Sequence, residues 1–319
     1  MTSPSPVVPR VERGQIYQNV YAKRDEERPV VRSAVLERAR VSDGALCFDG
    51  DAARSRAFAD GVFLLEVPRD SDLRAPDLFS QQFHLGRAVE PYGRFRDLTS
   101  ETFGDPLLGF HQRVNQIEQF LLERRYWAAH YPPEITATGE MFSVLGRAVL
   151  RSVLQAVGIP PEDWFRASGG CSEGMGSYHL TFNHYRPHFD SCGLSSHKDD
   201  GFVTVLRTTN PGLEANRHGE WESVDADDRA FVVNFGLAME ILTAECRSAV
   251  AAIMHRVRRQ STDRSSFGHF TSSNCEPGRD LGIFRFRPGI GLELVCASRE
   301  LIDNNDHEIY EGTERPSGE

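Results

Sequence analysis

From about Tyr178 onward, the chain consists of short apolar stretches that turn-forming residues separate. Stretches of this length that contain β-branched and aromatic residues are typical of β-strands. They predict strands at residues 178–185, 201–208, 230–235, 266–270, 283–286 and 292–295, and one earlier strand at 61–67.

The first half of the chain instead places apolar residues at helical spacing. This spacing predicts helices over residues 77–87, 112–126 and 140–157. The third helix is expected to end at Gly158, because Pro160 and Pro161 follow it closely.

A helical first half followed by a β-rich second half predicts an α+β fold, with helices that support a jelly-roll-type double sheet. We expect one domain over residues 31–319, with helical support at about 70–170 and the jelly-roll core at about 176–297. Residues 1–30 are proline-rich and charged, and are expected to form a flexible N-terminal arm.

Composition narrows the class of protein. A formal net charge of −10 over 319 residues disfavours nucleic acid as a partner, because phosphates bind to positive surfaces. The six cysteines are scattered and form no C-x-x-C pair, so they predict reduced thiols. The chain shows no signal peptide and no apolar run long enough to cross a membrane. We therefore expect a cytoplasmic protein with no membrane partner.

His197 and Asp199 begin the apolar run of residues 197–206 (HKDDGFVTVL). On a strand, residues two apart project to the same side, so such a strand would aim an imidazole and a carboxylate at one point. Lys198 would then face away, and so would Asp200, as a solvent-facing group or a neighbour of the site. The alternative is a surface strand with incidental polar residues.

Two similar pairs occur nearby, but neither leads into a strand-like run. His188 and Asp190 run into a turn-rich stretch, and His218 and Glu220 lie among turn-forming residues. The pattern therefore favours His197 and Asp199.

The best third ligand is His255, which lies between Ile253 and Val257 on a predicted strand. Two histidines and one carboxylate bind Fe(II) on one face and leave the other positions open for a chelating co-substrate and O2. The three residues therefore predict a non-haem Fe(II) site.

Two further pairs, also spaced by two, surround this predicted site. Arg264 and Ser266 could hold a carboxylate through parallel hydrogen bonds and a hydroxyl. Tyr185 could donate to a carboxylate, and Asn183 could orient substrate or co-substrate. The alternative for each pair is ordinary strand packing.

These residues resemble, in order and spacing, the isopenicillin N synthase-like family of 2-oxoglutarate/Fe(II)-dependent dioxygenases. The matching segments are residues 183–187 (NHYRP), 193–206, 233–242, 255–257 and 264–266. Residues 233–242 resemble the family's strand-turn-strand before the distal histidine. The chain departs from the family at residues 243–253. The family commonly has a glycine-containing turn there, whereas the residues of this chain have high helix propensity.

The resemblance implies a double-stranded β-helix and the cofactor Fe(II), with 2-oxoglutarate (2OG) and O2 as co-substrates. It assigns the metal to His197, Asp199 and His255, and 2OG to Arg264, Ser266, Tyr185 and Asn183. The implied reaction is oxidation of a C–H bond of a small molecule, by hydroxylation or else by desaturation or cyclisation, in bacterial secondary metabolism. Three alternatives stay open: oxidation with Fe(II) and O2 but without 2OG, a non-redox metal hydrolase, and a binding jelly roll.

Residues outside these motifs receive a simpler interpretation. Arg94, Arg96 and Arg113 form either a solvated face or contacts to an acidic substrate. Six other histidines are expected to be packing or surface groups: His111, His130, His179, His184, His269 and His307.

Overall fold

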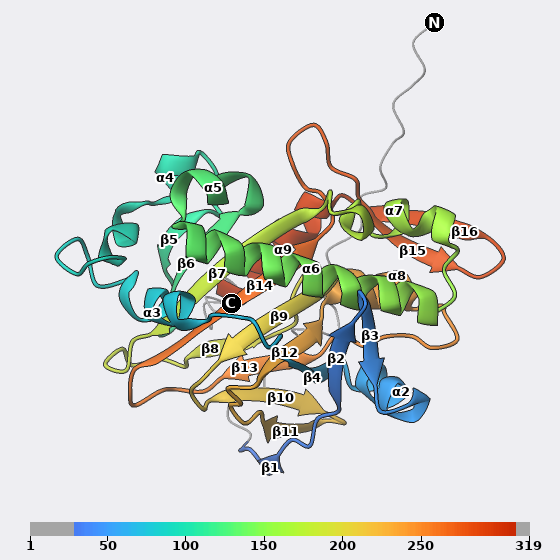
Figure 1. Ribbon diagram of the computed structural model, residues 1–319, viewed down its shortest axis with the longest axis horizontal. Helices are drawn as coiled ribbons and strands as arrows, with labels where there is room; N and C mark the ends of the chain where they lie inside the picture. Colours follow the sequence, from blue (N-terminus) through green and yellow to red (C-terminus); the bar gives the residue numbers. More distant parts are fainter. Residues whose placement is uncertain (1–28, 311–319) are drawn as a thin grey trace, which may run out of the picture.

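The computed structural model describes residues 29–310, and Figure 1 shows how their helices and strands are arranged. The predicted N-terminal arm lies outside the described residues, except for residues 29 and 30. Two sheets supply the walls of one cavity, and helices pack on the outer face of the larger sheet. This arrangement confirms the predicted α+β jelly roll.

The larger sheet has nine strands and is antiparallel except where β2 pairs with β4. In spatial order its strands are β3 (Ala45–Phe48), β2 (Arg38–Ser42), β4 (Val62–Glu66), β12 (Ala230–Phe235), β9 (Val203–Thr208), β14 (Arg264–Ser272), β7 (Ser177–Tyr185), β6 (Ile117–Glu123) and β5 (Gly109–Gln112). Its centre is buried on both faces, which explains why these strands are rich in apolar residues.

The smaller sheet has five strands, and a separate hairpin follows it in the chain. The five strands, in spatial order, are β1 (Arg32–Ser33), β11 (Glu220–Ser223), β10 (Leu213–Arg217), β13 (Met254–Val257) and β8 (Leu194–His197). The hairpin is formed by β15 (Ile283–Arg287) and β16 (Gly291–Cys296).

The longest helix, α6 (Pro133–Ala156), runs across the outer face of the large sheet and contacts β9 and β14 (Figure 1). It begins with a proline, which has no N–H to leave unpaired at a helix start. It is followed by Gly158, whose φ of +80° is a left-handed conformation that favours glycine. The buried face of α6 includes Phe142 and Leu150, while Val144 on the other side is exposed.

Shorter helices complete the described fold. The α-helices are α2 (Asp51–Asp60), α3 (Arg74–Gln82), α4 (Ser100–Phe103), α5 (Trp127–His130), α7 (Trp164–Ala167), α8 (Leu237–Thr243) and α9 (Ser298–Tyr310). Single 3₁₀ turns lie at Gly93–Asp97, Arg124–Tyr126, Pro161–Asp163 and Cys171–Glu173. None of the helices at residues 29–310 combines the length and apolar character of a membrane span.

The prediction of a helix at residues 112–126 is wrong. The segment forms strand β6, which pairs with β7 on one side and β5 on the other, followed by a 3₁₀ turn. Both faces of β6 are covered, so its apolar residues show no alternation that would distinguish a strand from a helix. Residues 233–242 also differ from the expected strand-turn-strand, because β12 is followed by helix α8.

His269 on β14 predicts a loss of stability in acid. It is fully buried, with its Nε2 atom 2.9 Å from Ser143 Oγ of α6, and burial lowers its pKa from 6.5 to about 3. Below pH 6.5, His269 therefore binds a proton in the unfolded chain but not in the folded chain. The neutral, buried His269 contributes fully to stability above pH 6.5, and this contribution is lost as the pH falls.

We expect His269→Phe to weaken this acid sensitivity. Between pH 7 and pH 5, the free energy of unfolding of the unmodified protein should fall by about 2 kcal/mol more than that of the variant. Urea unfolding at both pH values measures the difference. His130 is half-buried, and the His130→Phe variant should behave like the unmodified protein. An equal fall in the free energy of unfolding of all three proteins would contradict the prediction.

A second prediction concerns α9, which packs against β8. Asn305 Nδ2 donates to the backbone oxygen of Lys198 at 2.9 Å, and this bond ties α9 to the loop after β8. Asn305→Ala should destabilise the protein by about 1–2 kcal/mol, because a buried carbonyl loses a donor.

Hydrogen–deuterium exchange should show faster exchange in α9 and in the loop after β8 of this variant. Asn304→Ala, at a half-buried position on the same helix, is the control and should leave exchange unchanged. Similar exchange in both variants would show that Asn305 does not anchor the helix.

Candidate functional site

Three predicted ligands meet at one point of the cavity. His197 is the last residue of β8, His255 lies on β13, and these strands pair with the two histidines directly opposite each other. Their ring centroids are 4.2 Å apart. Asp199 Oδ1 lies 3.6 Å from the Nε2 atom of each histidine.

The route by which Asp199 reaches this point differs from the predicted strand. Strand β8 ends at His197 and β9 begins at Val203, so residues 198–202 form a loop. Lys198 does turn away from the cluster, as expected, and its Nζ atom lies 2.8 Å from Glu240 Oε2. The loop, rather than strand alternation, places the carboxylate beside the imidazole.

Hydrogen bonds turn the three side chains toward a common centre. His197 Nδ1 lies 2.8 Å from the Ser195 oxygen, and His255 Nδ1 lies 3.3 Å from the Ile253 oxygen. Because a carbonyl oxygen only accepts, each Nδ1 carries a proton, and Nε2 is the nitrogen that each ring offers to a metal.

The Asp199 carboxylate is oriented in the same way. Its Oδ2 atom accepts hydrogen bonds from Thr204 Oγ1 and Asn234 Nδ2, both at 2.6 Å, which leaves Oδ1 for the centre. Two imidazole nitrogens and one carboxylate oxygen match the donor set of a non-haem Fe(II) site. The residues present therefore fit the metal that the resemblance implies.

The charge states of these groups also suit a cation. Burial alone would raise the pKa of the Asp199 carboxyl, but His255, His197 and Thr204 outweigh it and hold the pKa below its usual range. Burial, and then His197, lower the pKa of His255 to about 4. At neutral pH the carboxylate is therefore charged and His255 has a free lone pair.

Helix α8 holds the loop that carries Asp199. The backbone N–H groups of Leu237 and Ala238 donate to the oxygens of Asp199 and Asp200, at 2.7 and 3.0 Å. Gly236 makes this approach possible, since a Cβ atom there would lie 2.4 Å from the Gly201 oxygen. The resemblance to the family had predicted a strand, and not a helix, after the turn in residues 233–242.

The second group of predicted residues lies on two paired strands of the large sheet. In the register of β7 and β14, Arg264 is opposite Tyr185, and Ser266 is opposite Asn183. All four side chains are buried and line the same cavity as the triad of His197, Asp199 and His255.

Neutral groups hold Arg264 in place. Its Nε donates to the Pro211 oxygen and its Nη2 to Thr208 Oγ1, both at 3.1 Å, while Nη1 lies 3.5 Å from Ser266 Oγ. Its guanidinium carbon lies 4.6 Å from the centre of the Tyr185 ring. Among residues 29–310, no carboxylate forms an ion pair with this arginine, which is only 2% exposed. Because a buried unpaired charge is costly, the arrangement calls for an anion from outside the chain.

The whole cavity is about 140 Å³ in volume, and it is also lined by residues that the sequence did not predict or that were expected elsewhere. Asp200 lines the cavity and is half-buried. Of the two positions expected for it, it therefore occupies the one beside the site and not the one facing solvent. His179, expected to be a packing or surface group, also lines it. Helix α9 covers one side with Ile302, Asn305, Asp306, Ile309 and Tyr310.

Of the three arginines considered for substrate contact, Arg113 alone lines this cavity. Its guanidinium carbon lies 3.9 Å from the centre of the Tyr310 ring, and its Nε donates to Gln119 Oε1 at 2.9 Å. Arg94 and Arg96 are exposed. No local motif marks Arg113, which reaches the cavity because β5 and β6 extend the large sheet.

The two rival histidine–carboxylate pairs lie outside the cavity. Asp190 forms an exposed ion pair with Arg259, and His218 is exposed with a left-handed φ of 55°. Both positions agree with the turns predicted for them.

Comparison with known proteins identifies the segment that holds these residues. A family model described as the 2OG-Fe(II) oxygenase superfamily matches residues 176–273. This segment runs from the start of β7 to the end of β14, and it includes all seven predicted site residues.

Individual relatives agree with this match. The 2-oxoglutarate-dependent dioxygenase 21 of Oryza sativa subsp. japonica is 25% identical over 59% of this chain and 53% of its own length. The 2'-deoxymugineic-acid 2'-dioxygenase of Hordeum vulgare is 34% identical over 37% of this chain and 33% of its own. The chain thus spans about half or less of the length of these curated relatives.

A solved structure supports the fold. The dioxygenase for auxin oxidation in rice superposes with a TM-score of 0.56 at 21% identity, over 78% of this chain and 88% of that one. Residues 176–273 of this chain are therefore similar in sequence to the 2OG-Fe(II) oxygenase superfamily, and the fold of the chain is the jelly roll of such oxygenases.

Proposed function

We propose that this protein is an Fe(II)- and 2OG-dependent oxygenase that oxidises a C–H bond of a small molecule. His197, Asp199 and His255 would hold the metal, and Arg264, Ser266, Tyr185 and Asn183 would hold 2OG. The observation that carries the proposal is the buried guanidinium of Arg264, which pairs with no carboxylate of residues 29–310 and lines the same cavity as the three converging ligands.

The positions of these groups suit a dicarboxylate. A guanidinium binds one carboxylate through two parallel hydrogen bonds, and the Ser266 and Tyr185 hydroxyls lie beside it to add donors. The other end of 2OG would then reach the three ligands, where bound Fe(II) supplies redox chemistry with O2 that zinc lacks. A metal-dependent hydrolase or a binding jelly roll would not need a dicarboxylate clamp of arginine and serine beside the metal.

The reaction that we propose is hydroxylation, with desaturation or cyclisation as alternatives that share the same first step. The substrate would lie between the triad and helix α9, where Arg113, Asp200 and Asp306 add polar groups to an apolar wall. A role in bacterial secondary metabolism, a cytoplasmic location and the single-domain boundaries at residues 31–319 stay predictions.

Turnover of 2OG tests the proposal directly. Protein loaded anaerobically with Fe(II) and 2OG should release succinate and CO2 when O2 is admitted, and a mass-spectrometric substrate screen should show products that have gained one oxygen or lost two hydrogens. Tight retention of zinc at His197, Asp199 and His255, with no turnover of 2OG across a broad screen, would favour the hydrolase or binding alternatives. Substrate oxidation that needs Fe(II) and O2 but not 2OG would favour the third alternative.

The neighbouring residues Asp199 and Lys198 should respond very differently to substitution. Removing an outer partner of a metal ligand already costs about 10–100-fold in affinity, so Asp199→Ala should weaken Fe(II) binding by more than that. Lys198→Ala loses only a partly exposed ion pair with Glu240, worth less than about 1 kcal/mol. Equilibrium dialysis with Fe(II) under anaerobic conditions compares the two. Equal losses would refute the proposed site.

Substitution of Arg264 should weaken the binding of 2OG and not that of the metal. Arg264→Lys keeps the charge but loses the two-pronged geometry, and should raise the apparent KM for 2OG about 10–100-fold with Fe(II) affinity unchanged.

Arg207→Lys provides a matched control for this measurement. Arg207 is another buried arginine of the large sheet, but it pairs with Asp77 and does not line the cavity. Its substitution should leave the KM for 2OG unchanged. A joint loss of iron and 2OG in Arg264→Lys would show that the arginine does not bind 2OG.

A further inference from the structure

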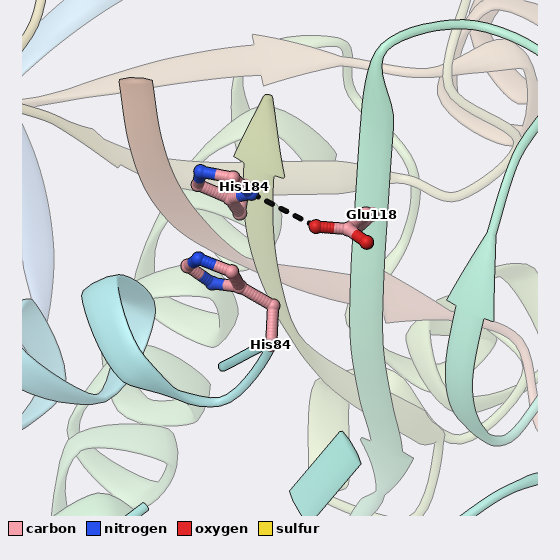
Figure 2. A group of neighbouring side chains, drawn as sticks. All are labelled: His84, Glu118 and His184. Atoms are coloured by element: carbon pink, nitrogen blue, oxygen red, sulfur yellow. Dashed lines mark hydrogen bonds and ion pairs between the residues drawn. The ribbon is translucent and has the colours of Figure 1, made fainter. Parts of the chain in front are cut away.

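A second cluster of possible ligands lies on the other face of the large sheet. His184 sits on β7 between Asn183 and Tyr185, so strand alternation turns it away from the cavity that they line. Glu118 is directly opposite His184 in the pairing of β6 with β7. His84, which follows α3, completes the cluster, as Figure 2 shows.

The three side chains offer ligand atoms that lie within 4.8 Å of one another, and all three are buried. His184 is held between two carboxylates, with Nδ1 3.0 Å from Glu118 Oε2 and Nε2 3.2 Å from Asp263 Oδ1. A histidine that binds a metal commonly donates its other N–H to a carboxylate in this way. Nδ1 would then face the metal, and Asp263 would orient the ring.

His84 supplies the independent observation. It is 8% exposed, and its Nδ1 atom is buried with no hydrogen-bond partner among residues 29–310. Burial, and then the neighbouring His184, lower the pKa of His84 to about 4, so the ring is neutral at pH 7. A buried imidazole nitrogen in that state has unused hydrogen-bonding capacity, which a metal ion or a water molecule would satisfy.

We propose that His84, Glu118 and His184 form a second metal site, which binds a divalent transition metal, best matched by Zn²⁺, separately from the triad. Two imidazoles and one carboxylate are a frequent zinc donor set, with water in the fourth position. A dication would also balance the charges of Glu118 and Asp263. The site would fasten the end of α3 to β6 and β7, directly behind Asn183 and Tyr185.

The present ring geometry sets a condition on binding. The rings of His84 and His184 stack with centroids 3.5 Å apart and planes 6° from parallel. An imidazole binds a metal in its own plane, so two stacked rings cannot share one ion. Metal binding therefore requires the His84 ring to turn about its Cβ–Cγ bond, which breaks the stack.

The test uses the full chain with the first site removed by His197→Ala and His255→Ala. Titration with Co²⁺, followed by its visible spectrum and by equilibrium dialysis, should show one ion per chain in a four-coordinate site. Zn²⁺ should displace the Co²⁺ and should raise the Tm. Neither readout requires oxygenase activity, so the proposal can fail or succeed independently of the proposed function.

Two further substitutions in this background identify the ligands. His84→Phe keeps a ring to stack on His184 but removes the nitrogens, and Glu118→Gln keeps the size of the side chain but removes the charge. Each should weaken Co²⁺ binding at least about 10- to 100-fold. His130→Phe, at a histidine that packs on Phe103 elsewhere, should leave binding unchanged. Absence of a bound ion, or binding that survives both ligand substitutions, would overturn the proposal and leave the cluster as a packed polar group.

Discussion

The site depends on the pairing of strands that lie far apart in the sequence. Strands β8 and β13 pair so that His197 and His255 face each other, and β7 and β14 pair so that Arg264 faces Tyr185. Each pairing brings together residues more than 50 positions apart. Because strand register shifts in whole residues, a slip of one position would turn these side chains to the wrong face.

Electrostatics complement this geometry. The triad presents one carboxylate and two imidazole nitrogens toward a single point, which suits a cation. Arg264 presents a buried positive charge that has no acidic partner in the described part of the chain. A metal ion and a dicarboxylate together would satisfy both. Neither group alone accounts for the buried charges, which is why we treat metal and co-substrate as one site.

Much of the β-rich half could be predicted, because its strands are short, apolar and bounded by turns. The motif residues could also be predicted, since their spacing by two holds on β7 and β14. Strand β6 could not, because burial on both faces removes the alternation that distinguishes a strand from a helix. Asp199 was expected beside His197 and does lie there, but a loop that α8 holds in place positions it, and not the expected strand. The contributions of Arg113 and of α9 depend on tertiary packing, which no local pattern records.

The most direct test of the account is anaerobic titration of the protein with Fe(II) and 2OG together, followed by absorption spectroscopy. Chelation of Fe(II) by a 2-oxo acid produces a visible charge-transfer band that neither component shows alone. We predict that this band appears with one equivalent of each, that Asp199→Ala abolishes it, and that Arg264→Lys shifts it to higher 2OG concentration. A protein that binds Fe(II) but never develops the band with 2OG would contradict the account.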